Sequence, residues 1–297
     1  MAMGPDLRGM SIAVLGGDAR ELVVIEKLSS LGALIKVMGL PVKDLPGVTV
    51  IRNPEEELSG IQALILPVPG IDDNGCLYCP LAAGPLNLNM EWLDRIQPNI
   101  PVFVGLAKPK LAQIAAQKNL RLIETMKLDE VAILNSIPTA EGAVQMAMEM
   151  LPVTIHGCKA LVLGFGRTGA TLSRLLGAMG ARTMVAARRP GYLARITELN
   201  LIPVPFYKLD EYLYDIEIIF NTVPVLVLTE EILRKVSPEA VIIDLASAPG
   251  GTDFRAAEVL GIKAVLAPGL PGKVAPRTAG MILAQVISRL LLEEMGR

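Results

Sequence analysis

Short apolar runs alternate along the chain with longer segments in which apolar residues recur every three or four positions. One apolar run, at residues 10–15, ends in glycine and is followed by a helical pattern and a second run at 33–38. The same order returns with runs at 159–163 and 182–187. Runs of this length, bounded by glycine, proline or charge, are typical of strands buried on both faces of a parallel sheet. The pattern therefore predicts an α/β protein with two doubly wound domains and a cleft between them.

The length of 297 residues also favours two domains, because it exceeds what one hydrophobic core usually organises. We place a flavodoxin- or Rossmann-like substrate domain at residues 1–138, completed by an amphipathic C-terminal helix at 278–297. A linking helix at 139–151 joins it to a Rossmann dinucleotide-binding domain at 152–277. Further strands are expected at 48–51, 62–67, 101–105, 120–123, 216–221, 240–244 and 262–266.

The composition is apolar enough to raise the question of a membrane protein, since 52% of the residues are hydrophobic and the mean hydropathy is +0.47. No apolar run approaches the roughly 18 residues of a membrane span, so we expect no membrane association. The first ten residues include Asp6 and Arg8 and lack the apolar core of a secretion signal, which predicts a cytoplasmic protein. With 28 basic and 30 acidic residues the net charge is −2, and we expect no nucleic-acid partner.

The turn Gly164-Phe165-Gly166-Arg167-Thr168-Gly169 carries the chemistry of the second half. It follows an apolar run and opens a helical pattern, as the G-x-G-x-x-G fingerprint requires. Gly164 permits the tight turn, Gly166 lets the backbone approach a pyrophosphate, and Gly169 allows close packing of helix on strand. We expect the N–H groups of Arg167, Thr168 and Gly169 to hold the phosphates at the helix N-terminus. The alternative is that these glycines serve turn geometry alone.

The choice of cofactor follows from the end of the next predicted strand, where Arg188 and Arg189 stand. An NAD enzyme usually offers a carboxylate there to the ribose 2′-hydroxyl, and this segment has none. Two guanidiniums suit a 2′-phosphate, so the sequence favours NADP(H), with NAD(H) possible. The alternative is that one or both arginines are solvated surface charges.

In open α/β sheets ligands bind beyond the carboxyl ends of the strands. In the second domain this rule selects loops expected to flank the nicotinamide, at Asn221, Thr222, Val223, Pro224, Asp244, Leu245, Ala246, Ser247 and Gly269.

The sequence offers few candidates for proton transfer. The one histidine, His156, lies at the amino end of a predicted strand, so we expect it to be structural or solvent-exposed and away from the cleft. Proton transfer must then use a carboxylate, a lysine or water, and the candidates are Lys273, Glu141 and Asp18. The C-x-x-C at residues 76–79 has no second pair, so we expect no metal site.

Several blocks longer than the glycine turn resemble the A-subunit family of dipicolinate synthase, and together they span nearly the whole chain. They lie at residues 16–21, 135–142, 164–169, 244–254 and 268–280. The resemblance implies oxidation of dihydrodipicolinate, a product of the lysine pathway, to dipicolinate in the mother cell of sporulating bacteria. It also implies a second, flavoprotein-like partner, the B-subunit of dipicolinate synthase.

On this resemblance the substrate is a small planar dicarboxylate, whose carboxylates need cationic or N–H partners. The groups expected to supply them are Arg20, Lys108, Lys273, Ser136, Thr139 and a helix N-terminus at Ala140.

Two alternatives remain open. Residues 271–278 also resemble the cofactor-side motif of methylenetetrahydrofolate dehydrogenases, although no matching substrate lysine is evident in the first domain. The chain could instead be an NADP-binding scaffold for the flavoprotein-like partner, because no general base stands out. The apolar positions of the last helix could pack within the chain or form a homo-oligomer.

Overall fold

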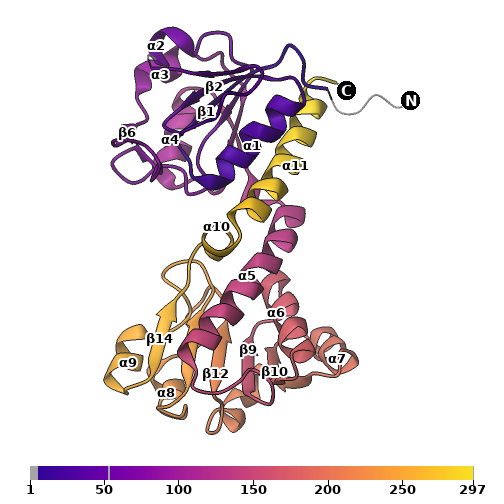
Figure 1. Ribbon diagram of the computed structural model, residues 1–297. Helices are drawn as coiled ribbons and strands as arrows, with labels where there is room; N and C mark the ends of the chain where they lie inside the picture. Colours follow the sequence, from indigo (N-terminus) through magenta and orange to yellow (C-terminus); the bar gives the residue numbers. More distant parts are fainter. Residues whose placement is uncertain (1–5, 53, 297) are drawn as a thin grey trace, which may run out of the picture. The chain divides into compact units, whose positions relative to one another are not determined.

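The computed structural model describes residues 6–52 and 54–296, and the chain folds into two compact units (Figure 1). Unit 1 comprises Met1–Ala132 and Pro276–Arg297, and unit 2 comprises Ile133–Ala275. The chain thus passes between the units after Ala132 and again after Ala275, slightly before the boundaries expected at 138 and 277. Each unit holds a six-stranded, all-parallel sheet, which confirms the prediction of an α/β protein with two doubly wound domains.

The sheet of unit 1 has the order β3-β2-β1-β4-β7-β8. Its strands are β1 (Ser11–Leu15), β2 (Leu34–Met38), β3 (Val48–Val50), β4 (Ala63–Ile65), β7 (Pro101–Val104) and β8 (Arg121–Glu124). The short strands β5 (Cys76–Leu77) and β6 (Leu86–Asn87) pair separately and antiparallel. The helices are α1 (Ala19–Ser30), α2 (Pro54–Glu57), α3 (Met90–Asp94), α4 (Pro109–Gln117), the 3-10 turn η1 (Thr125–Lys127) and α11 (Pro276–Glu294). The strand order reverses between β1 and β4, which marks the carboxyl ends of these two strands as the place for a ligand.

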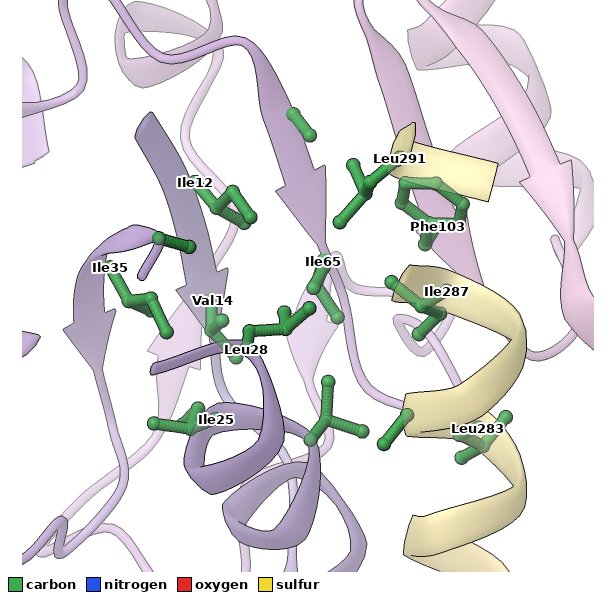
Figure 2. Packing of buried hydrophobic residues seen from close by; sticks show 14 of the residues in the cluster. Ile12, Val14, Ile25, Leu28, Ile35, Ile65, Phe103, Leu283, Ile287 and Leu291 are labelled. Atoms are coloured by element: carbon green, nitrogen blue, oxygen red, sulfur yellow. The ribbon is translucent and has the colours of Figure 1, made fainter. Parts of the chain in front are cut away.

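The C-terminal helix α11 completes the core of unit 1 (Figure 2). Its residues Leu283, Ile287 and Leu291 pack in one cluster with Phe103 of β7 and with the inward face of α1. Each fully buried side chain of this size contributes roughly 1.5–3 kcal/mol. The N-terminal segment and the C-terminal helix therefore pack in the core of one unit, beneath the carboxyl end of β1.

The sheet of unit 2 repeats the topology with the order β11-β10-β9-β12-β13-β14. Its strands are β9 (Lys159–Leu163), β10 (Arg182–Ala187), β11 (Ile202–Pro205), β12 (Ile218–Asn221), β13 (Val241–Asp244) and β14 (Lys263–Leu266). The helices and 3-10 turn are α6 (Arg167–Ala178), α7 (Pro190–Glu198), η2 (Phe206–Tyr212), α8 (Glu230–Leu233), α9 (Phe254–Val259) and α10 (Leu270–Val274). Here the order reverses between β9 and β12, directly beside the glycine turn.

The linking helix differs from the sequence-based expectation. Helix α5 runs from Asp129 to Met150, with Pro138 in its interior rather than at its start. The hydroxyl of Thr139 donates to the carbonyl oxygen of Asn135 at 2.7 Å and does not cap a helix. A proline inside a helix costs about 3 kcal/mol, but Pro138 is buried and the helix packs along unit 2, and this packing outweighs the cost. The expected helix N-terminus at Ala140 is therefore wrong.

Within the described part of the chain, every helix is too short or too polar to cross a lipid bilayer.

Candidate functional site

The glycine turn of unit 2 joins β9 to α6, and the three glycines meet different surroundings. Gly164 has φ +95°, and a Cβ atom there would lie 2.6 Å from Oγ1 of Thr222. A Cβ atom on Gly169 would lie 2.1 Å from the carbonyl oxygen of Gly164. At Gly166, by contrast, no described atom lies within 4 Å of the Cβ position. Two glycines thus allow tight packing, and the third leaves room above the backbone.

Helix α6 begins at this open space beside Gly166. Gly166 is its N-cap residue, and no described side chain caps it. The first backbone N–H groups of a helix lack intrahelical partners and carry the positive end of its dipole. Arg167 is exposed and Thr168 is half-buried in this first turn. The turn therefore offers backbone donors to an anion at the point where Gly166 admits it.

Two arginines follow β10, one strand away from the turn. The guanidinium of Arg188 lies 5.4 Å from the ring centroid of Phe206, and that of Arg189 lies 5.5 Å from the ring of Tyr192. Tyr192 in turn packs edge-on against Phe165 of the glycine turn, with centroids 5.9 Å apart. Both arginines are exposed, and the contact with Tyr192 links Arg189 to the turn, whereas Arg188 packs on Phe206 of η2.

Two polar residues at the strand ends are used inside the fold. Asn221 is fully buried, and its amide bonds both the N–H and the carbonyl oxygen of Val223, each at 3.0 Å. Asp244 is also buried, and it accepts hydrogen bonds from Ala246 N, Gly251 N and the hydroxyl of Thr252 at 2.7–3.0 Å. These side chains hold the loops in place rather than facing a ligand. Of the other loop residues, Pro224 and Ser247 are exposed, Thr222, Val223 and Leu245 are half-buried, and Ala246 is buried.

The proton-transfer candidates of unit 2 lie on α5 and α10, two helices that pack together at Gly142. Val274 contacts Gly142, where a Cβ atom would lie 3.1 Å from its Cγ1, and Lys273 and Glu141 are the sequence neighbours of this pair. Both candidates are exposed. Gly269, with φ +69°, opens α10. His156 is exposed beside Gly180, before the amino end of β9 and away from the carboxyl ends of the strands.

The anion site expected on the linking helix is not formed. Ser136 is buried and its hydroxyl bonds the carbonyl oxygen of Ile133 and the hydroxyl of Thr171, both at 2.6 Å. Ala140 is fully buried inside the continuous helix. With Thr139 bonded within the helix as well, this segment provides a packing surface and not free donors.

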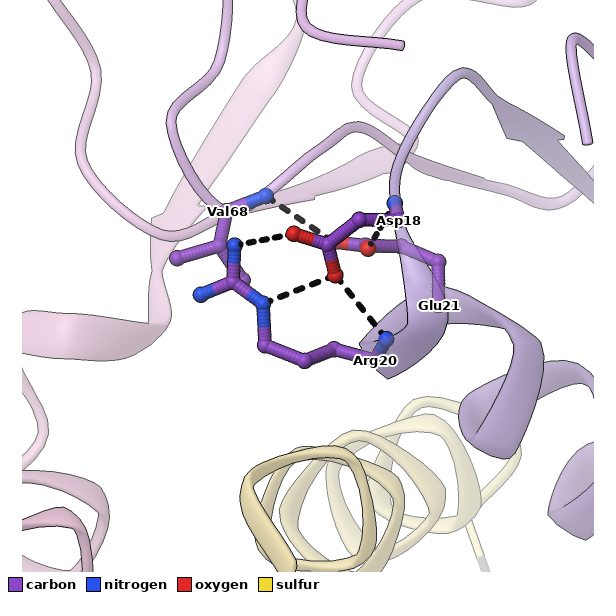
Figure 3. A network of polar contacts seen from close by, with 4 residues as sticks. All are labelled: Asp18, Arg20, Glu21 and Val68. Carbon is purple, nitrogen blue, oxygen red and sulfur yellow. Dashed lines mark hydrogen bonds and ion pairs between the residues drawn. The ribbon is translucent and has the colours of Figure 1, made fainter. Parts of the chain in front are cut away.

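A charged cluster occupies the corresponding turn of unit 1, after β1 (Figure 3). Asp18 caps α1, and it accepts bonds from the backbone N and the Nε of Arg20 at 2.9 and 3.0 Å and from Nη2 at 2.8 Å. Glu21 accepts from Asp18 N at 2.8 Å and from Val68 N at 3.0 Å. The N-terminus of α1 is thus already occupied by the protein's own carboxylates, unlike that of α6.

The two carboxyl groups of this cluster titrate differently. Burial acts to raise the pKa of Asp18, but the hydrogen bonds and charge of Arg20 outweigh it and hold that pKa below its ordinary value. Burial raises the pKa of Glu21 to about 7, against the opposing effects of the Asp18 N–H and the Arg20 charge. Glu21 was not among the sequence-based candidates. The D-x-x-E capping-box spacing of Asp18 and Glu21 was the signal that pointed to its place.

Lys108 is the N-cap residue of α4, four residues after the end of β7, and it is exposed. It lines a hollow of about 470 Å³ together with Tyr78 and the free thiols of Cys76 and Cys79. The carbonyl oxygen of Tyr78 accepts a hydrogen bond from Gly17 N at 2.8 Å, which ties this hollow to the turn of the charged cluster. Unit 1 therefore gathers Asp18, Arg20 and Lys108 on one edge of its sheet. Among the described residues, no group of three or more histidine, cysteine or acidic side chains is placed to hold a metal ion.

Two parallel sheets of the same order, one with a glycine turn opening an uncapped helix, define a two-domain α/β protein of the dehydrogenase type. Residues 11–126 match the family of N-terminal domains of the dipicolinate synthase A-subunit. The A-subunit of dipicolinate synthase from Bacillus subtilis (strain 168) is 43% identical over 289 residues, covering 97% of each chain. The chain belongs to the A-subunit family of dipicolinate synthase.

Solved structures agree with this assignment. The crystal structure of the dipicolinate synthase A-subunit from Bacillus halodurans superimposes with a TM-score of 0.94 at 40% identity, covering 96% of this chain and 99% of the other. The transhydrogenase from Sinorhizobium meliloti has a TM-score of 0.69 at 15% identity, covering 95% of this chain and 94% of the other. At that identity the second likeness concerns the fold alone.

Proposed function

We propose that this chain is the oxidoreductase subunit that binds NADP(H) in unit 2 and oxidises dihydrodipicolinate to dipicolinate. The observation that carries the cofactor assignment is the contrast between the two turns. The N-terminus of α6 is uncapped by any described side chain and opens onto the space above Gly166. The N-terminus of α1 is filled by Asp18 and Glu21. A dinucleotide phosphate would therefore meet a helix N-terminus without a described side-chain cap in unit 2, and one already capped by carboxylates in unit 1.

The residues present fit the cofactor. The first turn of α6 would hold the pyrophosphate, and Arg188 and Arg189 would hold the 2′-phosphate that distinguishes NADP from NAD. The loops at residues 221–224 and 244–247, with Gly269, would border the nicotinamide, which supplies a hydride acceptor when bound. Asn221 and Asp244 fix the shapes of these loops from inside.

The substrate's two carboxylates need cations, and we propose Arg20 and Lys108 in unit 1 for this role, with Lys273 as a further candidate. Asp18 keeps the guanidinium of Arg20 in a fixed orientation through two side-chain bonds. Oxidation removes one hydride and one proton from the substrate. The product ring is aromatic, so proton loss is favourable and a strong base is not required. This fits the ion-paired state of Asp18, whose lowered pKa makes it a weak base.

The family name denotes one subunit of a synthase, and we propose that this chain works with a second, different chain.

Calorimetric titration of the full chain with NADPH and with NADH, each with and without saturating dipicolinate, tests the proposal. We expect NADPH to bind more tightly than NADH, and dipicolinate to change the NADPH affinity because both ligands serve one reaction. In the same titrations Arg20→Ala should weaken dipicolinate by about tenfold or more while leaving NADPH unchanged. Arg95→Ala, at an exposed arginine of unit 1, is the matched control. Failure of the chain to bind either dinucleotide would contradict the proposal.

A further inference from the structure

Glu21 is a buried carboxyl group that the proposed reaction does not use. Only 2% of the residue is exposed. Its two oxygens accept hydrogen bonds from the backbone N–H groups of Asp18 and Val68, which follow β1 and β4, the strands at the reversal of the sheet order (Figure 3). A Cβ atom on Gly17 would lie 2.6 Å from the Cγ of Glu21, so this turn is built closely around the carboxyl group.

The charges of the cluster do not balance. Asp18 and Glu21 each carry a negative charge when ionised, and Arg20 carries a single positive one. The side chain of Arg20 is only 10% exposed, and its Nε and Nη2 atoms bond Asp18. A substrate carboxylate that pairs with the same guanidinium brings a third negative charge into this poorly solvated place. At separations of a few ångströms and partial burial, such like-charge repulsion is strong enough to shift protonation.

We propose that Glu21 takes up a proton from solvent when a dicarboxylate binds at Arg20, so that binding at this site is coupled to proton uptake. This inference rests on the proposed role of Arg20 in the substrate site. It assigns to Glu21 a positioning and charge-compensating role without contact to the substrate.

Glu21 is the member of the cluster suited to accept the proton. Asp18 is bonded directly to the guanidinium, which favours its ionised form. Glu21 faces an apolar surround that includes Val24 of α1, Ile65 of β4, Phe103 of β7 and Ile287 of α11. None of the other residues that line this small space is titratable, and the one hydroxyl among them, of Thr125, donates to the carbonyl oxygen of Val104. The pKa of Glu21, raised by burial to about 7, places the proton exchange near neutral pH.

Coupling to a proton makes the affinity for dipicolinate depend on pH. If the protonated form of Glu21 accepts the ligand, dipicolinate affinity falls as the pH rises through the pKa of this group. We expect a loss of about tenfold between about pH 6 and about pH 8. Glutamine has the shape of the protonated carboxyl group and no charge, so Glu21→Gln should bind dipicolinate about tenfold more tightly than the wild type at about pH 8. If Glu21 had only a structural role, Glu21→Gln should instead bind dipicolinate more weakly than the wild type.

The test is calorimetric titration of the full chain with dipicolinate in phosphate and in Tris, two buffers that differ in ionisation enthalpy. The difference between the observed enthalpies counts the protons taken up. At about pH 8 we expect about one proton per dipicolinate for the wild type and none for Glu21→Gln, whose affinity should not vary with pH. This variant also controls for titration of the ligand itself. Glu26→Gln, at an exposed position of the same helix, should retain the wild-type behaviour.

Equal enthalpies in the two buffers, or a wild-type affinity that is the same at both pH values, would overturn the inference and leave the proposed function standing. These wild-type measurements do not depend on the folding of any variant. Failure of the wild type to bind dipicolinate at any pH would overturn the proposed substrate, and the role of Glu21 with it.

Discussion

The pKa values of Asp18 and Glu21, two carboxyl groups three positions apart, are shifted in opposite directions because the groups have different partners. Asp18 shares two side-chain bonds with the guanidinium of Arg20, and the hydrogen bonds that Glu21 accepts within the described chain come from backbone N–H groups. A direct charge partner offsets the desolvation of the first, and two neutral donors do not offset that of the second. The spacing predicts the capping box but not this difference, which depends on β7 and α11, elements distant in sequence.

At Arg188, reversing the charge tests cofactor choice. Arg188→Asp should weaken NADPH by about a hundredfold and NADH by much less, because only NADPH carries the 2′-phosphate that the guanidinium would pair with. Calorimetric dissociation constants for both dinucleotides check this. Arg174→Asp, at an exposed arginine of α6, controls for the change in net charge. Equal weakening of the two dinucleotides by Arg188→Asp would remove the argument for phosphate recognition.

Residue roles inside loops were harder to predict than residue positions. The rule on strand ends correctly placed Asn221 and Asp244 at the carboxyl ends of β12 and β13. It could not show that these side chains make hydrogen bonds within the protein. Asp244 accepts hydrogen bonds from Gly251 and Thr252, and both of these residues lie in a loop that folds back onto it. Such closure depends on the three-dimensional path of the loop, which hydrophobic periodicity does not encode.

Among the elements, the strand–turn–helix unit β9–α6 contains glycines with separable functions. Gly166 has φ −85° and no described neighbour at its Cβ position, so Gly166→Ala should change the free energy of unfolding by less than about 1 kcal/mol. The added methyl group fills the space for the pyrophosphate, and NADPH affinity should fall by about tenfold or more. Gly169→Ala instead places a Cβ atom 2.1 Å from the Gly164 carbonyl oxygen. This matched variant should lose about 1–3 kcal/mol of stability.

Denaturant unfolding and calorimetry of the two variants check these values. A Gly166→Ala protein that is stable and binds NADPH normally would mean that the phosphates do not approach this glycine.

Element prediction succeeded where one physical signal dominated. The strands β9 and β10 begin and end as predicted, since each is a buried apolar run with clear breaks. Strand β11 was not among the predicted strands; it contains Pro203 and Pro205, which are unusual in central strands, and it lies at the edge of the sheet, where prolines are tolerated. The start of α5 was misplaced for the related reason that Pro138 and Thr139 imitate a helix start. Local signals at proline were overridden by packing in both cases.

At the scale of the whole molecule, the two sheets have the same strand order, but the helices that follow their first strands begin differently. Both sheets reverse their strand order beside the first turn, between β1 and β4 and between β9 and β12. In unit 1 that turn is closed by its own carboxylates and presents a charged side chain, and in unit 2 it is open and presents backbone donors. Under the proposed function, the repeated sheet sets where each ligand would lie, and the residues that cap the first helix decide which ligand each edge accepts.

Hydrogen exchange measured along the full chain tests this division. The first N–H groups of α6 have no described side-chain cap, so they should exchange rapidly without ligand and be slowed by about tenfold or more by saturating NADPH. The N–H groups of Asp18 and Arg20 already bond carboxylates, so NADPH should leave their exchange unchanged. Dipicolinate should instead act on residues 16–21 and on Val68, where a carboxylate at Arg20 alters the cluster. Protection of the α1 turn by NADPH, with no effect at 165–169, would show that the two units had been assigned the wrong ligands.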